Sequence, residues 1–183
     1  KNKIKSNLSF LDKHGSDRIY LKTMGENFIK NKLNLRIMKS NDVYFLHKLA
    51  NDPINRKYAK NKIKIEFYDH KEWFSRKLKS KLSKIFILEC LNTPLGQIRL
   101  DIRNNQVYID YAIDKCFRKI KLGQKILSLI LEKKNFKKFL KKKKLIAYVH
   151  KSNLASKKIF HNLSFQQFVS KGNFVKFIRT YEN

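Results

Sequence analysis

The sequence contains few residues that could form a disulfide framework or a soft-metal site, because only two of its 183 residues are cysteine. Cys90 and Cys116 match no metal-binding or disulfide spacing, so we expect no metal and no metal-dependent chemistry. The sequence also lacks a signal-peptide pattern and any apolar run long enough to span a membrane. We therefore expect a soluble, cytoplasmic protein with no membrane partner, whose length suits one domain and some additional chain.

Acidic residues are scarce as well, with 14 Asp and Glu against 43 Lys and Arg and a formal net charge of +29. Such an excess, taken alone, favours binding to nucleic acid, an acidic membrane or another polyanion. Lysine greatly exceeds arginine, however, and asparagine and isoleucine are also abundant, which is the drift expected from A/T-rich codons. The lysines are spread along the chain and cluster only at 137–138 and 141–144. We interpret these clusters as a solvated surface segment and do not expect nucleic-acid binding.

The most informative stretch is 108–127, which predicts a strand, a turn and a helix in succession. An alternating run at 108–113 is typical of a strand, and an apolar pattern of helical period begins at Leu122. A helix start carries unpaired backbone N–H groups and the positive end of the helix dipole, so the basic turn at this point can hold a pyrophosphate. Gly123 permits close approach of the backbone.

This turn resembles the R-x-x-G-x-G/A loop with which GNAT-family N-acetyltransferases hold the diphosphate of acetyl-coenzyme A. The residues that carry the resemblance are Arg118, Lys119, Ile120, Lys121, Leu122 and Gly123, followed by Gln124 at the helix start. The preceding segment, 114–118, is similar to the family's D-P-x-Y/F-R motif. The resemblance implies that acetyl-CoA is the cofactor and that these residues bind it. Lys121 departs from the pattern, since the family usually has its first glycine there.

A second segment, 153–165, is similar to the family's N-x-A-S/A-x-x-x-Y/F-x-x-x-G-F helix. The resemblance implies that Asn153 bonds the pantetheine arm and that Ser156 and Phe160 line the cofactor channel. The position of Asn153 equally predicts a plain helix N-cap. Ser164 replaces the usual glycine, and Phe160 stands where many relatives carry a tyrosine that protonates the departing thiolate.

A third segment resembles the N-D-P-x-x-R…H-x-x-W-F pattern of GNAT enzymes that act on aminosugar nucleotides, including the N-acetyltransferase of pseudaminic acid synthesis. The residues concerned are Asn51, Asp52, Pro53, Arg56, His70, Trp73 and Phe74. The resemblance implies a substrate-binding wall, to which we add Tyr108, with a small-molecule sugar nucleotide as the acceptor. Arg56 suits a phosphate or carboxylate, and Trp73 suits a sugar or base face. Alternatively, Trp73 and Phe74 are core residues of an amphipathic helix, and His70 is a cap or surface residue.

We expect the first 33 residues to form an N-terminal extension to a domain at 34–183. The chain begins at a lysine, from which we expect a fragment or an engineered boundary. Segment 10–19 resembles the D-G-x-G-x-x-R-I/V sequence near the end of nucleotide-sugar hydrolases of pseudaminic acid synthesis, through Asp12, Gly15, Arg18 and Ile19. This resemblance implies fusion or association with a UDP-sugar hydrolase domain. The alternative is a helix at 17–30 that packs on the domain or is left mobile.

The predicted element order is that of the GNAT fold, an α/β (α+β) domain with a mixed, mostly antiparallel sheet flanked by helices. Expected strands lie at 35–39, 84–91, 96–103, 106–113, 145–150, 165–169 and 174–181. Expected helices follow Ser40 or Asn41 as the cap, cover 73–82 and 122–136, and start at Asn153. Turns are predicted at 92–94 and 104–105. No internal repeat is present.

Acetyl transfer requires a neutral amine and an oriented donor for the developing oxyanion. The family resemblance gives the oxyanion donor as the Tyr111 backbone N–H and the pantetheine partner as Ile113. Three side chains are candidates for the general base: Asp110, Glu89 and His150. An ordered water chain is an equal alternative.

Three functions remain open at this point. The first is acetyl-CoA-dependent acetylation of a nucleotide-linked deoxy-aminosugar, and the second is acetylation of a protein amine, such as a ribosomal N-terminus, by the same fold. The third is a non-enzymatic basic nucleic-acid-binding module, which follows if Lys121 abolishes cofactor affinity.

Overall fold

A computed structural model describes residues 13–132, 136, 140, 143–170 and 172–180. These residues include a seven-stranded sheet in the order β1-β2-β3-β4-β5-β7-β6. The strands are β1 (Leu33–Ile37), β2 (Ser83–Cys90), β3 (Thr93–Arg103), β4 (Gln106–Ile113), β5 (Lys144–His150), β6 (Gln166–Val169) and β7 (Phe174–Thr180). Every neighbouring pair is antiparallel except β4 and β5, which are parallel. The predicted mixed, mostly antiparallel sheet is confirmed.

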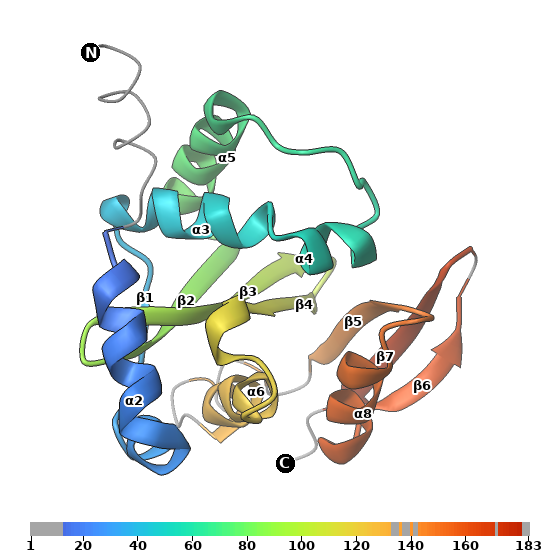
Figure 1. The fold of residues 1–183 in the computed structure, drawn as a ribbon. Helices are drawn as coiled ribbons and strands as arrows, with labels where there is room; N and C mark the ends of the chain where they lie inside the picture. The colour runs from blue at the N-terminus through green and yellow to red at the C-terminus, as the bar shows by residue number, and fades with distance from the viewer. Residues whose placement is uncertain (1–12, 133–135, 137–139, 141–142, 171, 181–183) are drawn as a thin grey trace.

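Helices cover both faces of this sheet (Figure 1). On one face lie α3 (Val43–Ala50), α4 (Pro53–Tyr58) and α5 (Phe67–Lys79); on the other lie α2 (Gly15–Asn31), α6 (Leu122–Glu132) and α8 (Leu154–Asn162). The alternation of side chains along the strands gives each face its own apolar cluster. The cluster beside α6 includes Leu88, Ile98 and Phe177, and the one beside α3 and α5 includes Ile85 and Ile87.

Two hairpin turns join β2, β3 and β4, and the sequence places one of them correctly and the other incorrectly. Asn104 and Asn105 have φ angles of 46° and 56° and form the predicted two-residue turn between β3 and β4. The turn between β2 and β3 was expected at 92–94 but uses Leu91 and Asn92, whose φ angles are 47° and 62°. The prediction was wrong because Pro94 lies inside β3, where a register shift at Leu88/Glu89 accommodates it.

The N-terminal helix α2 is packed into the same core as the rest of the chain. Leu21 and Ile29 are 1% and 2% exposed and belong to the cluster beneath α6. The helix bends at Gly25, which has a φ of 80°. Residues 10–12 of the hydrolase-like segment lie outside the described residues, whereas Arg18 is buried and pairs with Asp114, its Nε 3.1 Å from Asp114 Oδ2. Residues 15–31 thus contact the segment that leads into the turn at 118–122.

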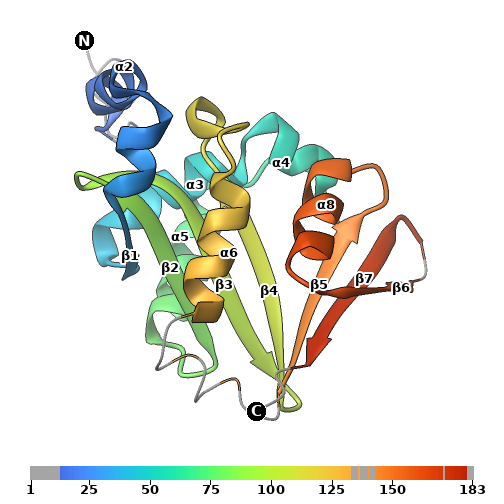
Figure 2. The ribbon, with the colours of Figure 1, turned by 90° about the horizontal axis from the view of Figure 1, so that it is seen from below.

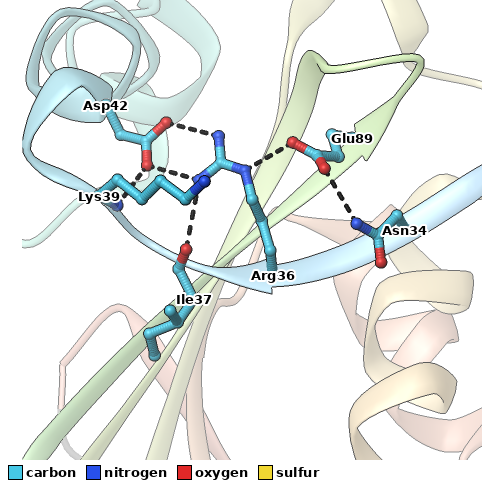
Figure 3. A network of polar contacts seen from close by, with 6 residues as sticks. All are labelled: Asn34, Arg36, Ile37, Lys39, Asp42 and Glu89. Atoms are coloured by element: carbon cyan, nitrogen blue, oxygen red, sulfur yellow. Dashed lines mark hydrogen bonds and ion pairs between the residues drawn. The ribbon is translucent and has the colours of Figure 1, made fainter.

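The start of the α3 region is fixed by charge rather than by the expected cap at Ser40 or Asn41. A 3-10 turn, η1 (Ser40–Asp42), precedes α3, and the Asp42 carboxylate accepts a hydrogen bond from the Lys39 backbone N–H at 2.6 Å. Figure 3 shows the Arg36 guanidinium between Asp42 and Glu89. Its Nη1 and Nη2 donate to Asp42 at 2.7 and 2.8 Å, and its Nε donates to Glu89 at 2.6 Å.

Candidate functional site

A groove opens where β4 and β5 separate. The two strands pair only from Gln106 opposite Lys144 to Tyr108 opposite Ile146, and beyond that point they diverge (Figure 2). On its other side β4 stays paired with β3, and the Asp114 N–H donates to the Leu95 carbonyl at 2.8 Å. Along an antiparallel strand, the backbone N–H and C=O groups of successive residues point alternately to one side of the strand and to the other. The backbone groups of Ile109, Tyr111 and Ile113 therefore face the open groove.

The basic turn between η2 (Lys115–Phe117) and α6 has an unusual backbone. Lys119 and Lys121 both have positive φ angles, 71° and 63°, in the left-handed region that glycine favours. Both side chains are exposed, while Ile120 is half-buried against the core and Leu122 is 1% exposed. The turn therefore holds the conformation of a glycine-containing loop with lysine at the glycine position.

The Arg118 side chain braces this turn instead of projecting from it. Its Nε donates to the Ile113 carbonyl at 3.1 Å, and its Nη2 lies 2.5 Å from Asp52 Oδ1. Asp52 also caps α4 by accepting from the Ile54 and Asn55 N–H groups. The predicted substrate residue Asp52 and the predicted cofactor residue Arg118 are thus bound to each other.

Helix α6 presents its N-terminus to the groove. The first intrahelical bond joins the Lys125 N–H to the Lys121 carbonyl, so the N–H groups of 122–124 have no partner within the helix. A Cβ added at Gly123 would lie 3.0 Å from Ile159 Cδ1 and 3.1 Å from Tyr111 Cε2. The glycine therefore allows α6 to approach α8 and β4 closely.

The deeper part of the groove is bridged by side chains. The Tyr111 hydroxyl lies 2.9 Å from Ser156 Oγ, and burial raises the pKa of Tyr111 to about 12. Phe160 is 2% exposed and packs against Tyr111 with ring centroids 6.0 Å apart. Asn153 caps α8 by accepting from the Ser156 N–H at 3.1 Å. Gln124 of α6 accepts a hydrogen bond from Asn162 Nδ2 of α8 at 3.4 Å.

Across the sheet, Asp110 is the centre of a polar cluster. Gln97 Nε2 donates to Asp110 Oδ2 at 3.1 Å, and Arg99 Nη2 lies 3.5 Å from the same oxygen. The Arg99 guanidinium stacks 5.6 Å from the Trp73 ring. Arg56 Nη1 donates to the Ile63 carbonyl, whereas its Nε is buried without a hydrogen-bond partner. The pKa of Arg56 is lowered from its ordinary value, because the effect of burial exceeds the opposing effect of the negative charge of Asp110.

His70 is buried beneath this cluster, not on the surface or at a helix cap. It is 3% exposed, and its ring lies 5.2 Å from that of Trp73 and 5.1 Å from that of His47. Burial, with a smaller effect of His47, lowers the pKa of His70 to about 4. The His70 ring makes one hydrogen bond to the Val43 backbone, and its buried Nε2 has no hydrogen-bond partner. His70 is a neutral imidazole at physiological pH.

Two other predicted site residues have structural partners. Asn51 donates from Nδ2 to the Ile65 carbonyl and accepts the Ile65 N–H at Oδ1, both at 2.8 Å, which ties the 61–66 segment to α3. Glu89 is 5% exposed and is held by Arg36 and by Asn34 Nδ2 at 3.0 Å (Figure 3). It does not line the cleft, so the expectation that its strand brings it there is corrected.

The other two candidate bases line the cleft. The Asp110 side chain is 54% exposed. His150 Nδ1 lies 2.8 Å from Ser152 Oγ, and its ring contacts those of Tyr58 and Phe174. The two faces open into one cleft of about 2130 Å³, lined by Gly123, Asn153 and Ser156 on the groove side and by Arg56, Gln97 and Asp110 on the other. Since ligand pockets usually measure ~300–1,000 Å³, this cleft can hold two ligands.

Several cleft residues were not predicted from the sequence. Gln97, Arg99, Asp101 and Arg103 alternate along β3, and this period of two places them all on the same face of the sheet as Asp110. Lys60 lies 5.2 Å from the Tyr148 ring, which stacks on Tyr108. The alternating polar residues of 97–103 were the available signal. No His, Cys, Asp or Glu cluster suited to a metal ion, and no helix long and apolar enough to cross a membrane, occurs among the described residues.

The sequence matches the family model described as "Acetyltransferase (GNAT) domain" over residues 32–166. None of the curated proteins compared with the chain matches it. Many solved structures are similar in fold, including the following three. A domain from Methanocaldococcus jannaschii DSM 2661 is 21% identical with a TM-score of 0.69, and the match covers 81% of this chain and 97% of that one. Spermidine N-acetyltransferase from Vibrio cholerae, in complex with CoA and spermine, is 15% identical with a TM-score of 0.68, covering 81% and 94%. RimL, a ribosomal L7/L12 alpha-N-protein acetyltransferase in complex with coenzyme A, is 14% identical with a TM-score of 0.63, covering 83% and 96%.

Proposed function

Because the chain belongs to the GNAT family and is an acetyl-CoA-dependent N-acetyltransferase, we propose that its acceptor is a nucleotide-linked aminosugar of the kind used in pseudaminic acid synthesis. The hypothesis of a non-enzymatic nucleic-acid-binding module is not retained. The proposal divides the cleft into a cofactor groove between β4 and β5 and an acceptor region beneath α4 and α5. The single observation that carries the acceptor class is the charge and aromatic content of that second region.

The groove fits acetyl-CoA, which supplies an acetyl thioester. The α6 N-terminus and the exposed Lys119 and Lys121 offer N–H groups and positive charge to a diphosphate. The backbone groups of Tyr111 and Ile113 face the groove and can pair with an amide-containing arm or an oxyanion. Ser156 and Phe160 line the groove from α8. The Tyr111 phenol, with its raised pKa, remains protonated at physiological pH.

The acceptor region is basic and aromatic. Its cationic lining residues are Arg56, Lys60, Arg99 and Arg103, and its aromatic ones include Tyr58, Trp73, Tyr108 and Tyr148. Of its three carboxylates, Asp69, Asp101 and Asp110, the second is already bound by Lys77 at 2.5 Å and by Ser83 at 2.7 Å. A polyamine would meet more positive than negative charge here. A diphosphate with a sugar and a base meets guanidinium groups and ring faces.

Asp110 is the proposed general base. It is the carboxylate that lines the cleft next to the strand positions whose backbone faces the cofactor groove. From this position it can accept the proton that the acceptor amine loses. An ordered water chain remains the alternative.

An acetylation assay with three acceptors tests the proposal: a UDP-linked 4-amino-deoxysugar, a peptide with a free N-terminus, and spermidine. We expect the sugar nucleotide to be acetylated with the highest kcat/KM. Preferential acetylation of the peptide would replace the sugar proposal with the protein-amine alternative.

Arg56→Ala sharpens this test. If Arg56 binds an anionic group of the acceptor, the variant should lower kcat/KM for the sugar nucleotide about 10-fold or more, because a charge-assisted hydrogen bond is worth ~1.5–3 kcal/mol. The affinity for acetyl-CoA should stay unchanged. The matched control is Arg76→Ala, an exposed arginine of α5 outside this cleft. Equal kinetics for the two variants would show that Arg56 serves only to hold the loop at Ile63.

A further inference from the structure

Gln97 carries a buried polar atom that the fold leaves unsatisfied. The residue lies in the middle of β3, is 8% exposed and lines the cleft. Its Nε2 donates to Asp110 Oδ2 at 3.1 Å, while its Oε1 is buried without a hydrogen-bond partner. Buried side-chain acceptors are usually satisfied, so an unpaired acceptor on a residue that lines a cleft is a candidate contact for a bound molecule.

The orientation of this amide is fixed by its neighbour. A carboxylate oxygen only accepts hydrogen bonds, so the group that faces Asp110 must be the NH₂ and not the carbonyl. Rotating the amide by 180° would bring two acceptors together. Oε1 therefore points away from Asp110, and its hydrogen-bonding capacity is free for an N–H or O–H donor of a bound molecule.

The position of Gln97 places this acceptor close to the expected site of reaction. Gln97 is opposite Ala112 in the β3–β4 register, between Tyr111 and Ile113, whose backbone groups face the cofactor groove. Asp110 is the next residue of β4 on the same face as Ala112. The amide oxygen and the carboxylate thus offer two adjacent acceptors on the side of the sheet opposite α6.

We propose that Gln97 is a positioning residue for the acceptor amine, with Oε1 accepting one N–H of a primary amine and the Asp110 carboxylate accepting the other. The proposal rests on the acetyl-transfer function given above and adds a residue that orients the acceptor amine. With both N–H bonds held on one side, the nitrogen lone pair points away from Gln97 and Asp110 and toward the groove.

The reaction transfers the acetyl group from the thioester sulfur to the amine nitrogen. A C–N bond forms and the C–S bond of the thioester breaks, with the electron pair leaving on sulfur. The amine gives up one proton, which Asp110 accepts and then releases to solvent, and the thiolate takes one proton from solvent to become a thiol, so no net proton is produced. Gln97 exchanges no proton and acts only by orienting the amine.

Gln97→Met tests the proposal, because methionine keeps the length of the side chain and removes both polar groups. We expect kcat/KM for the UDP-linked 4-amino-deoxysugar, or for the peptide amine if that is the acceptor used, to fall about 10-fold to 100-fold. The Kd for acetyl-CoA should stay within about twofold. The urea midpoint should not fall, because the change removes an unsatisfied buried oxygen together with the bond to Asp110. Gln167→Met, on exposed β6, is the control for the same chemical change.

A second comparison uses the acceptor itself. An N-methylated form of the same amine has one N–H fewer, so the wild-type enzyme should discriminate against it, and Gln97→Met should lose most of that discrimination. A lower urea midpoint with unchanged acceptor kinetics in Gln97→Met would overturn the proposal and make Gln97 a structural partner of Asp110. If the wild-type enzyme binds acetyl-CoA but acetylates none of the amines, the proposed acceptor class is wrong. A lower urea midpoint for Gln97→Met would then still contradict the proposal that Oε1 is unsatisfied in the folded protein.

Discussion

The two faces of the sheet are built by different means. On the groove face, the features that suit a cofactor are backbone features: the open edge of β4, the left-handed turn at Lys119 and Lys121, and the N-terminus of α6. On the acceptor face they are side chains, several with buried atoms that lack partners, such as Gln97 Oε1 and His70 Nε2. Backbone features constrain sequence to a recognisable motif, whereas a side-chain site can be assembled from residues far apart in the chain. The cofactor and the fold are therefore easier to infer than the acceptor.

The largest effect is expected from the buried charge that anchors the groove face. Arg18 and Asp114 are both under 6% exposed. In Arg18→Met the buried Asp114 carboxylate loses this partner and keeps the more distant Lys48, whose Nζ lies 3.6 Å from Asp114 Oδ2. Breaking a buried pair typically costs ~3–5 kcal/mol, and we expect a loss near the lower end of that range in urea unfolding. The control is Lys30→Met, which removes an exposed pair with Glu26 on the same helix and should cost less than about 1 kcal/mol. Similar losses in the two variants would contradict a role for α2 in anchoring the turn.

On the acceptor face, the buried His70 should make the free energy of unfolding depend on pH. Above pH 6.5 His70 is neutral in both the folded and the unfolded chain; below it, only the unfolded chain takes up the proton readily, because the folded pKa is about 4. Stability should therefore fall between pH 6.5 and pH 4, by up to about 3 kcal/mol from this residue. His70→Phe should flatten that part of the pH profile, whatever its stability at pH 7.5. An unchanged slope would mean that His70 is hydrated and titrates normally.

The smallest effect is expected from the turn itself. Lys121 has a φ of 63°, a conformation that costs a side-chain-bearing residue ~1–2 kcal/mol, so Lys121→Gly should stabilise the protein by about 1 kcal/mol. The same substitution at Lys125, inside α6, should destabilise it by about 1 kcal/mol. Titration with acetyl-CoA then separates conformation from charge: weaker binding by Lys121→Gly, despite its greater stability, would show that the ammonium group contributes to diphosphate binding.

The sequence predicts the arrangement of strands and helices well because their periodicity and turn residues are local signals. The Asn104-Asn105 turn and the strand–turn–helix at 108–127 are examples. It does not predict the partner of Glu89, which depends on Arg36 lying in the neighbouring strand. Nor does it identify Gln97, since the amide is bound to Asp110 on one side and unpaired on the other only after β3 and β4 have paired. The prediction of Ser40 or Asn41 as a cap failed for the same reason, because Arg36 and Lys39 fix Asp42 instead.

The contact between Asp52 and Arg118 makes the two halves of the cleft mechanically dependent on each other. One carboxylate caps α4 on the acceptor side and holds the guanidinium that braces the turn beside the groove. A ligand that fixes the turn also fixes the capping of α4, and linkage requires the converse effect to be equal in free energy. We therefore expect the affinities for the two substrates to be coupled, with each substrate raising the affinity for the other by the same factor.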